Sequence, residues 1–438
     1  MSMLQAVARF FSFADANVRY VALGSLLLGA LGGLLGVFTL LKRRSLIGDA
    51  LAHAALPGVC LAFLFSGNKS PGWLLAGAVA TGLLAVFVLR LLEKNFPRIK
   101  TDAALGLVLT VFFGIGILLL THISRGGDGG QSGLDKFLFG QAAGMLPVDV
   151  WWIGVFAACV SAILLIAFKE FTLVSFDAVF AESIGFRASI LEVALLILTA
   201  IAIGIALQAV GVVLTAAILI LPAASARLWV KRIPQMALLS TVIGGISGIA
   251  GAFVSFLAPR LPSGPLIVLT ATAIFSLSLL FAPRRGILAK LWQHRANRRK
   301  IAKEHFLRTL WEELESQAAT TTISLDALSH GRAWEHGELR VGCQIAKQEQ
   351  LVTGNAGGVA FTAEGKAIAK KFVQKHRLWE YYLIEQANFP AAHVETDSDA
   401  SEHFLPDEIV AELEVRYREQ LAQEKLLQSP HPMGAKAQ

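Results

Sequence analysis

Nine long apolar runs limit what this chain can fold into. A helix that crosses a lipid bilayer needs roughly 20 predominantly apolar residues, and lipid offers no hydrogen bonds to an open backbone. The runs therefore predict an all-α polytopic membrane domain with about nine transmembrane helices. The spans are expected at 20–41, 46–66, 72–92, 102–120, 149–168, 188–208, 209–229, 235–257 and 264–282.

Charge is distributed unevenly and divides the chain into parts. Only 16% of the 438 residues are charged, whereas a soluble domain has about 25%. The long apolar runs all lie within 20–283, and the C-terminal part has the composition of a soluble domain. We expect an N-terminal interfacial segment at 1–19, a transmembrane domain at 20–283, a basic linker at 284–303 and a cytoplasmic domain at 304–438.

The basic loops predict how the chain is oriented. Lys and Arg concentrate in loops on the cytoplasmic side of a membrane. The denser basic segments, Lys42–Arg44, Lys94–Lys100 and the residues from Arg284 onward, fall on one side of the nine-span arrangement. We therefore expect a multi-pass protein with its N-terminus outside the cell and its C-terminal domain in the cytoplasm.

An acid and an imidazole lie four residues apart in the second apolar run. Asp49 and His53 therefore share one helix face, and His53 lies nine residues past Arg44 at the expected interface. That distance is roughly 14 Å, near the middle of a bilayer core about 30 Å thick.

Ionisable residues at that depth are functional candidates, and oxygen with imidazole nitrogen suits Mn²⁺, Fe²⁺ or Zn²⁺. A symmetric dimer with this helix at its axis would supply four ligands. The alternative is an internal Asp–His hydrogen bond that holds helices together.

The segment KEFTLVSFDAVFAESIGFR at 169–187 predicts a short amphipathic helix on the cytoplasmic side. Ser175 is a candidate N-cap, and Asp177 suits the first helical turn. The apolar residues at i, i+4 and i+8 and the closing glycine are Phe176, Phe180, Ile184 and Gly185. Such a helix either lies on the lipid surface or docks into a groove on a partner.

The chain contains no Gly-x-x-x-x-Gly-Lys-[Ser/Thr] phosphate-binding motif. It therefore cannot hydrolyse ATP by that route, and we expect it not to be an enzyme. If transport through it is pumped, a separate ATPase must dock.

Five stretches resemble the zinc/manganese/iron permease family of bacterial ABC transporters, in family order. They are RRSLIGDALAHAALPGVCLAF, KTDAALGLVLTVFFGIGILLL, LVSFDAVFAESIGF, AVGVVLTAAILILPAASARL and LPSGPLIVLTATAIF. The resemblance implies the membrane subunit of a metal importer in the bacterial inner membrane, working as a homodimer or with a related permease. It implies a cytosolic ATPase and an external solute-binding protein as partners. It also implies that the 175–185 segment is the coupling helix that contacts the ATPase, and that Asp49 and His53 line the translocation path.

The C-terminal part predicts a small α+β domain. One helix face carries Phe306, Leu307, Leu310, Trp311 and Leu314. The helical pattern that follows is interrupted at Gly331, Gly337 and Gly342. The stretch GNAGGVAFTAEGKAIAKKF then predicts a two-stranded turn that leads into a helix, an order that indicates a winged helix.

Acidic residues and histidines cluster farther along this part. His376 and Glu380 lie at i and i+4, and Asp399, Glu402 and His403 lie at i, i+3 and i+4. Each set presents its side chains on one face of a helix and could hold divalent ions. The alternative is a polar helix surface.

Residues 303–433 resemble the diphtheria-toxin-repressor family of metal-dependent regulators. The resemblance implies a winged helix followed by a helical metal-binding and dimerisation domain. The metal ligands that it implies are His305, His376, Glu380, Glu395, Asp399, Glu402 and His403. Asp399 stands where some members have Cys, which favours the harder ions Mn²⁺ or Fe²⁺.

The expected DNA reader departs from that family. The stretch HGRAWEHGELRVGCQIAKQEQ contains glycines together with Glu335, Glu338 and Glu349, which oppose direct readout of DNA. We therefore expect a metal importer permease whose tail binds cytosolic metal and slows transport, with no DNA partner. The alternative is a membrane-tethered, metal-responsive DNA-binding regulator. A third possibility, a cation channel or secondary carrier, is opposed by the coupling-helix signature.

Overall fold

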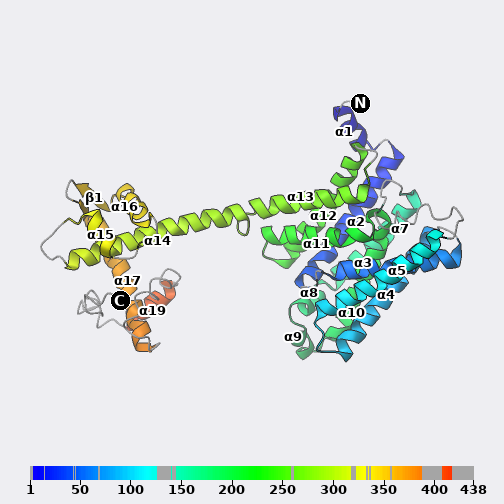
Figure 1. Ribbon diagram of the computed structural model, residues 1–438, viewed down its shortest axis with the longest axis horizontal. Coiled ribbons are helices and arrows are strands. Elements are labelled where there is room, and N and C mark those ends of the chain that lie inside the picture. The colour runs from blue at the N-terminus through cyan, green and yellow to red at the C-terminus, as the bar shows by residue number, and fades with distance from the viewer. Residues whose placement is uncertain are drawn as a thin grey trace. The chain divides into compact units, whose positions relative to one another are not determined.

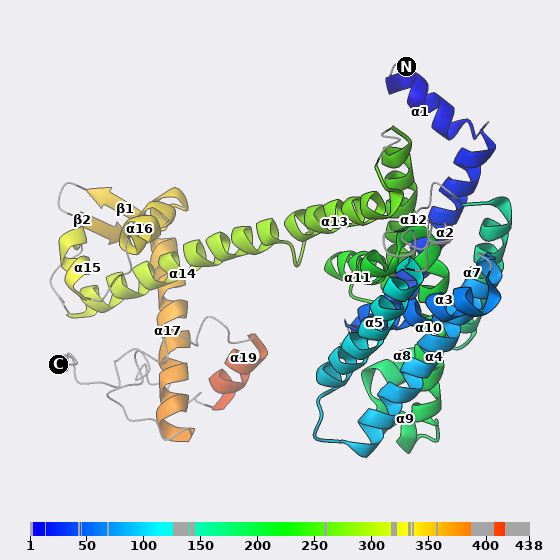
Figure 2. The same cartoon turned by 45° about the vertical axis from the view of Figure 1, so that its right-hand side comes forward.

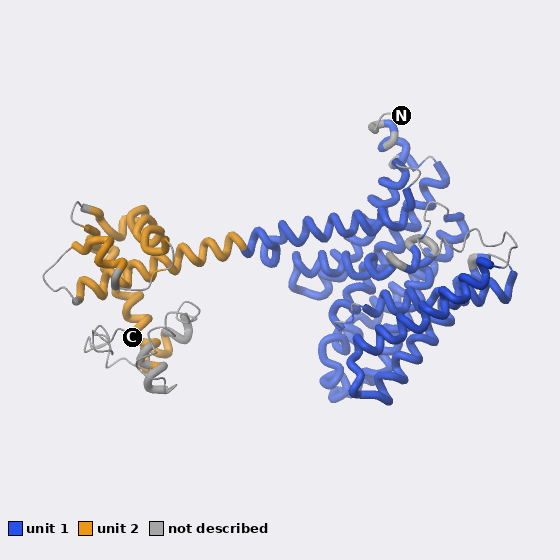
Figure 3. The backbone as a smooth tube through the Cα atoms, viewed as in Figure 1, with its two compact units in different colours: residues 1–290 blue, residues 291–438 orange. Residues whose placement is uncertain are grey.

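The structure is almost entirely helical (Figures 1 and 2). This computed structural model describes residues 3–13, 15–42, 44, 46–67, 70–125, 140, 145–257, 261–316, 322–331, 334, 337–355, 358–386 and 407–416. The chain divides into two compact units, residues 1–290 and 291–438 (Figure 3).

In the described part of the first unit, every regular element is a helix. These helices are α1 (Met3–Phe11), α2 (Ala16–Leu41), α3 (Ile47–Ser66), α4 (Pro71–Asn95), α5 (Thr101–Arg125), α7 (Pro147–Ile166), α8 (Phe168–Phe176), α9 (Ala178–Ser183), α10 (Ala188–Val210), α11 (Val212–Trp229), α12 (Ile233–Leu257) and α13 (Ser263–Phe281). Of the described helices, α2, α3, α4, α5, α7, α10, α12 and α13 are long and apolar enough to cross a membrane. The shorter α11 occupies the remaining predicted span, 209–229, so the prediction of an all-α polytopic domain is confirmed.

The N-terminal segment packs on the first unit through one aromatic side chain. Phe10 of α1 is buried and contacts Phe253 and Phe256 of α12, with ring centroids 5.1 and 5.6 Å apart. Asp15 then caps α2, because its carboxylate accepts a hydrogen bond from the Asn17 amide at 3.1 Å. The second helix therefore begins at Ala16, four residues before the start of the predicted span.

Small residues let α2 and α12 cross at close range. A Cβ atom added at Gly29 would collide with the backbone oxygen of Gly244, and one added at Gly248 would collide with that of Ser25. The Ser240 hydroxyl donates to the Gly33 carbonyl across the same crossing at 2.5 Å. These glycines serve packing within one chain, which is how small residues commonly act between membrane helices.

Helix α3 is the central helix of the first unit. It packs against α4, α5, α10 and α11, and residues from Ile47 to Cys60 form much of the largest buried apolar cluster. Gly58 and Gly77 let α3 and α4 approach closely, because a Cβ atom at either position would meet the other backbone. The polar side chains of α3 are therefore positioned by the four helices that pack around it.

The second unit contains five helices and a hairpin among its described residues. They are α14 (Ile287–Ser316), whose first residues belong to the first unit, α15 (Leu325–Gly331), α16 (Glu338–Gln348), β1 (Val352–Asn355), β2 (Gly358–Phe361), α17 (Ala363–Gln386) and α19 (Asp407–Arg416). The two strands are antiparallel and pair Val352 with Phe361. Helices followed by a hairpin and a further helix form the predicted small α+β domain (Figure 2).

The core of the second unit follows the predicted apolar face of α14. Phe306, Leu307 and Leu310 are fully buried, and Trp311 and Leu314 pack partly against them. The prediction that Gly342 interrupts the helical pattern is wrong, because α16 runs through it. A Cβ atom at Gly342 would collide with the Ala302 backbone, so this glycine lets α16 pack closely on α14.

Candidate functional site

Asp49 and His53 lie one turn apart on α3. The Nε2 atom of His53 is 3.5 Å from Oδ1 of Asp49, and the imidazole packs edge-on against Phe113 of α5 at a centroid distance of 4.6 Å. The other ring nitrogen, Nδ1, is buried and has no hydrogen-bond partner among the described residues. A buried nitrogen of this kind is costly unless a ligand or water satisfies it.

The two side chains differ in exposure. The His53 side chain is 13% exposed, whereas that of Asp49 is 36% exposed. Asp49 lies in the first turn of α3, where the free amide groups of a helix start favour a carboxylate. Counted from Ile47, His53 lies about 9 Å along a helix that is about 30 Å long, so Asp49 lies at the start of α3 and His53 about a third of the way along it.

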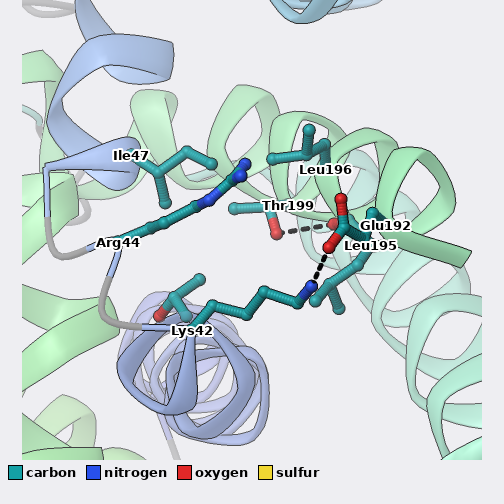
Figure 4. A pocket seen from close by; sticks show the side chains of 8 residues that line it. Lys42, Arg44, Ile47, Glu192, Leu195, Leu196 and Thr199 are labelled. Carbon is teal, nitrogen blue, oxygen red and sulfur yellow. Dashed lines mark hydrogen bonds and ion pairs between the residues drawn. The ribbon is translucent and has the colours of Figure 1, made fainter. Parts of the chain in front are cut away.

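A network of charged side chains lies beyond the start of α3 and joins three helices. Glu192 of α10 pairs with Lys42 at the end of α2 and with Arg90 of α4, the latter at 2.9 Å. Glu93 of α4 pairs with Arg44 at 3.1 Å and with Arg90 at 3.6 Å. All five side chains are largely buried, and Lys42 and Glu192, which contact one another directly, help to line a small cavity (Figure 4).

The network places three positive charges beside two negative ones. Burial lowers the pKa of the Lys42 ammonium group, and its hydrogen bond to the Glu192 carboxylate opposes that effect. Glu192 is therefore the anion that lets Lys42 and Arg90 stay close together. The network was not predicted from the sequence. The signal for it is that Arg90, Glu93 and Glu192 are charged residues in or next to apolar spans, at similar depths in the membrane.

The segment expected to contact the ATPase forms two short helices. Ser175 belongs to α8, where its hydroxyl donates to the Phe171 carbonyl at 2.6 Å. Its predicted role as the N-cap is wrong, because Asp177 has extended backbone and its carboxylate accepts a hydrogen bond from the Phe180 amide at 2.9 Å. Gly185 follows α9 with φ +97, a left-handed conformation that favours glycine.

The two helices expose apolar side chains to their surroundings. Phe176, Val179, Phe180 and Ile184 are between 52% and 79% exposed. In contrast, Ala181 is fully buried against Val174 and Ala188, so α9 is fixed to the first unit by its other side. These exposed side chains form an apolar projection, and α9 lies at one end of that unit (Figure 2).

In the second unit, His305 has a partner that suits a metal ligand. His305 is buried on α14, and its Nδ1 atom is 2.8 Å from the Glu338 carboxylate at the start of α16. When Nδ1 donates its proton to a carboxylate, the lone pair of Nε2 can bind a metal ion. This residue therefore fits the ligand role that the resemblance implies.

His376 is arranged differently. Its Nδ1 atom is 2.8 Å from the Arg308 guanidinium, and both side chains are buried. A guanidinium can only donate, so Nδ1 accepts and the ring proton resides on Nε2. A neutral imidazole has one such proton, and His376 can therefore bind a metal through Nε2 only after Arg308 has moved away.

The other implied metal ligands lie outside what the structure describes. The backbone of Glu380 belongs to α17, but its side chain is outside the described part, as are Glu395, Asp399, Glu402 and His403. Within the described residues, no three His, Cys, Asp or Glu side chains gather closely enough to hold a metal ion. The described part of the tail thus brings together His305 with Glu338 and His376 with Arg308.

Comparison with known proteins assigns both parts of the chain. Residues 14–282 match the ABC 3 transport family, and residues 362–419 match the iron dependent repressor, metal binding and dimerisation domain. The chain is 39% identical over 401 residues to the manganese transport system membrane protein MntC of Bacillus subtilis, which covers 91% of this chain and 90% of that protein.

Two further relatives support the first assignment. The zinc transport system membrane protein TroC of Treponema pallidum is 41% identical over 292 residues, 67% of this chain and 97% of that protein. The solved structure of PsaBC from Streptococcus pneumoniae in complex with Fab has a TM-score of 0.57 and 30% identity, covering 64% of this chain and 97% of the matched one. This chain is therefore a multi-pass membrane protein that belongs to the ABC 3 transport family and carries a domain of the iron-dependent-repressor type at its C-terminal end.

Proposed function

We propose that this chain is the membrane subunit of an ATP-driven importer for divalent transition metal ions, and that the ion passes beside Asp49 and His53. The observation that carries the proposal is the pair itself, a largely buried imidazole beside a partly exposed carboxylate. A carboxylate lies next to an imidazole whose Nδ1 atom has no partner among the described residues. A passing cation, or the water around it, would satisfy both groups.

The pair favours manganese, iron or zinc as the substrate. Carboxylate and imidazole ligands suit all three ions, and their affinities overlap. The relatives MntC and TroC are named for manganese and zinc transport. One chain offers two ligands, so a second copy or a related permease would supply the others across a dimer axis.

The remaining partners follow from the family and from the projection at α9. A separate cytosolic ATPase would supply the energy, and the exposed apolar side chains of α8 and α9 would dock into its surface. An external solute-binding protein would deliver the ion. In this arrangement the N-terminus lies outside the cell, and the basic segments and the tail lie in the cytoplasm of a bacterium.

Uptake measurements test the function. Proteoliposomes that contain the chain with its ATPase should accumulate Mn²⁺, Fe²⁺ or Zn²⁺ when ATP is present. Asp49→Ala and His53→Ala should each lower the rate by on the order of 10- to 100-fold, whereas Cys60→Ala, on the same helix, should retain it. If both variants insert correctly and take up metal at the normal rate, Asp49 and His53 do not line the ion path.

The tail would sense the metal in the cytoplasm. Metal binding at His376 requires the Arg308 hydrogen bond to break, and Arg308 lies on α14 whereas His376 lies on α17. Arg377, the next residue, also pairs with Glu315 of α14 at 2.9 Å. A bound ion would therefore change how these two helices contact one another, which is a means of slowing transport.

A DNA-binding role is the second candidate, and one observation favours it. The acids that oppose DNA readout are partly neutralised, because Glu338 contacts His305 and Glu349 pairs with Lys303 at 2.8 Å. Arg340, Gln344 and Lys347 are exposed on α16. Gel-shift measurements with the purified full chain at low and moderate salt decide, since salt-sensitive binding in the presence of metal supports this role.

A further inference from the structure

The first half of α14 is a helix without a buried side. Every residue from 291 to 300 is exposed, whereas the residues from 305 to 310 are buried in the core of the second unit. Leu291 and Trp292 are 50% and 78% exposed. Large apolar side chains in this position are left in water unless something covers them.

One side of this exposed helix carries apolar residues followed by arginines. Leu291, Trp292, Arg295, Arg298 and Arg299 occupy positions i, i+1, i+4, i+7 and i+8, which share one side of a helix. We call these five residues the arginine face. An apolar part containing tryptophan comes first and a group of three guanidinium groups follows, so the face suits a surface that is apolar on one side and anionic on the other.

A membrane surface has both properties and is within reach. Trp292 is eleven residues past Phe281, the last residue of α13, and this stretch spans at most about 40 Å when fully extended. Tryptophan is favoured at the boundary between hydrocarbon and headgroups. Clusters of Arg just cytoplasmic of a membrane helix bind anionic headgroups. A nucleic acid would pair with the guanidinium groups but would leave Leu291 and Trp292 uncovered.

We propose that the arginine face binds the anionic headgroup layer of the bilayer that surrounds the first unit. Leu291 and Trp292 enter the boundary region, and Arg295, Arg298 and Arg299 bind phosphate oxygens. This interaction fixes the start of the tail at the membrane surface. It depends on the chain being a membrane protein and is independent of which ion is transported.

Hydrogen exchange of the full chain in lipid nanodiscs tests this interaction. Amides of residues 291–299 should exchange more slowly in nanodiscs that contain phosphatidylglycerol than in phosphatidylcholine alone, by on the order of tenfold. The triple variant Arg295→Gln, Arg298→Gln and Arg299→Gln should lose that difference. A control triple variant, Lys347→Gln, Lys366→Gln and Lys371→Gln, removes the same charge from exposed positions of the tail and should keep it.

Two further arms separate the alternatives. Leu291→Ala with Trp292→Ala should reduce protection in both lipids, while exchange of the core amides at 305–310 shows that the domain is still folded. Equal exchange in the two lipids overturns the proposal. Protection by a short DNA duplex at the same salt concentration, without protection by phosphatidylglycerol, also overturns it and assigns the arginine face to nucleic acid.

Discussion

Glu192 shows how one residue can hold three membrane helices together. It is the shared anion for Lys42 and Arg90, which come from α2 and α4. A carboxylate within an apolar span is costly unless it is paired, and here two cations compensate it. Removing the carboxylate would leave both cations beside one another with no anion between them.

Glu192→Gln should therefore destabilise the first unit while nearly preserving side-chain volume. Because the partners are partly buried, we expect a loss of about 1–3 kcal/mol, measured as a lower thermal unfolding midpoint of the chain in detergent. Asp102→Asn removes an exposed carboxylate at the start of α5 and should change stability by less than about 0.5 kcal/mol. An unchanged midpoint for Glu192→Gln would show that the network does not hold the helices.

At the residue scale, only part of the site could be predicted from the sequence. The spacing of Asp49 and His53 places both on one helix face, and this is what the structure shows. The charged network escaped prediction because its members come from three separate spans, and spacing along one helix gives no distance to another. The partners of His305 and His376 escaped for the same reason.

The stability of the first unit depends on the close crossing of two of its helices, α2 and α12. Gly29 faces the backbone of Gly244 so closely that no side chain fits. Gly106 on α5 has no neighbouring atom where its Cβ would lie. The two positions form a matched pair for the same substitution.

Gly29→Ala should lower stability by about 1–3 kcal/mol or prevent correct insertion, because the two backbones must move apart. Gly106→Ala should leave the unfolding midpoint and the yield in the membrane near those of the parent chain. Size-exclusion profiles and thermal unfolding of both variants provide the comparison. Equal behaviour of the two variants would contradict the packing role of Gly29.

The apolar projection of α8 and α9 is the proposed docking surface for the ATPase. Phe176→Ala together with Val179→Ala should reduce co-purification of the ATPase and ATP-driven uptake by on the order of tenfold, because the exposed anchors of the contact are lost. Val148→Ala, an equally exposed position at the start of α7, is the control. Full retention of the ATPase by the double variant would point to another docking surface.

At the element scale, the sequence predicted most helices and missed details of their ends. Long apolar runs identify spans because lipid permits little else. The predicted N-cap Ser175 instead bonds to its own helix, and Gly342 lies inside α16, because hydroxyl and glycine residues favour several local arrangements. Only the packing of α16 on α14 decides that Gly342 continues the helix.

The whole molecule combines a membrane unit with a tail that carries a domain of the iron-dependent-repressor type. We expect uptake to slow as metal accumulates inside the vesicles, because the proposed regulation requires the tail to bind that metal. The double variant His376→Ala and His403→Ala should continue at its initial rate. In the Arg308→Gln variant, uptake should slow at an internal metal concentration about tenfold lower, because no guanidinium then competes with the metal for His376. The control variant Arg340→Gln should slow at the same metal concentration as the parent chain.

A binding measurement separates this regulation from transport itself. Titration of the purified full chain with Mn²⁺, followed by the spectroscopic signal of the free ion, should show weaker binding by the His305→Ala variant. If uptake by the double variant His376→Ala and His403→Ala slows as it does in the parent chain, metal binding at these residues does not regulate transport. That result would leave the tail with a role in dimerisation.

The transported ion is proposed to contact Asp49 and His53, and replacing one of these ligands with a softer one is the most direct test of that contact. The Asp49→Cys variant should take up Zn²⁺ at the expense of Mn²⁺, because thiolate favours the softer ion, so the ratio of the two uptake rates should rise by on the order of tenfold. If the variant keeps the parent chain's ratio of Zn²⁺ to Mn²⁺ uptake, with both rates unchanged or lowered equally, Asp49 does not contact the ion. It would then only stabilise the start of α3.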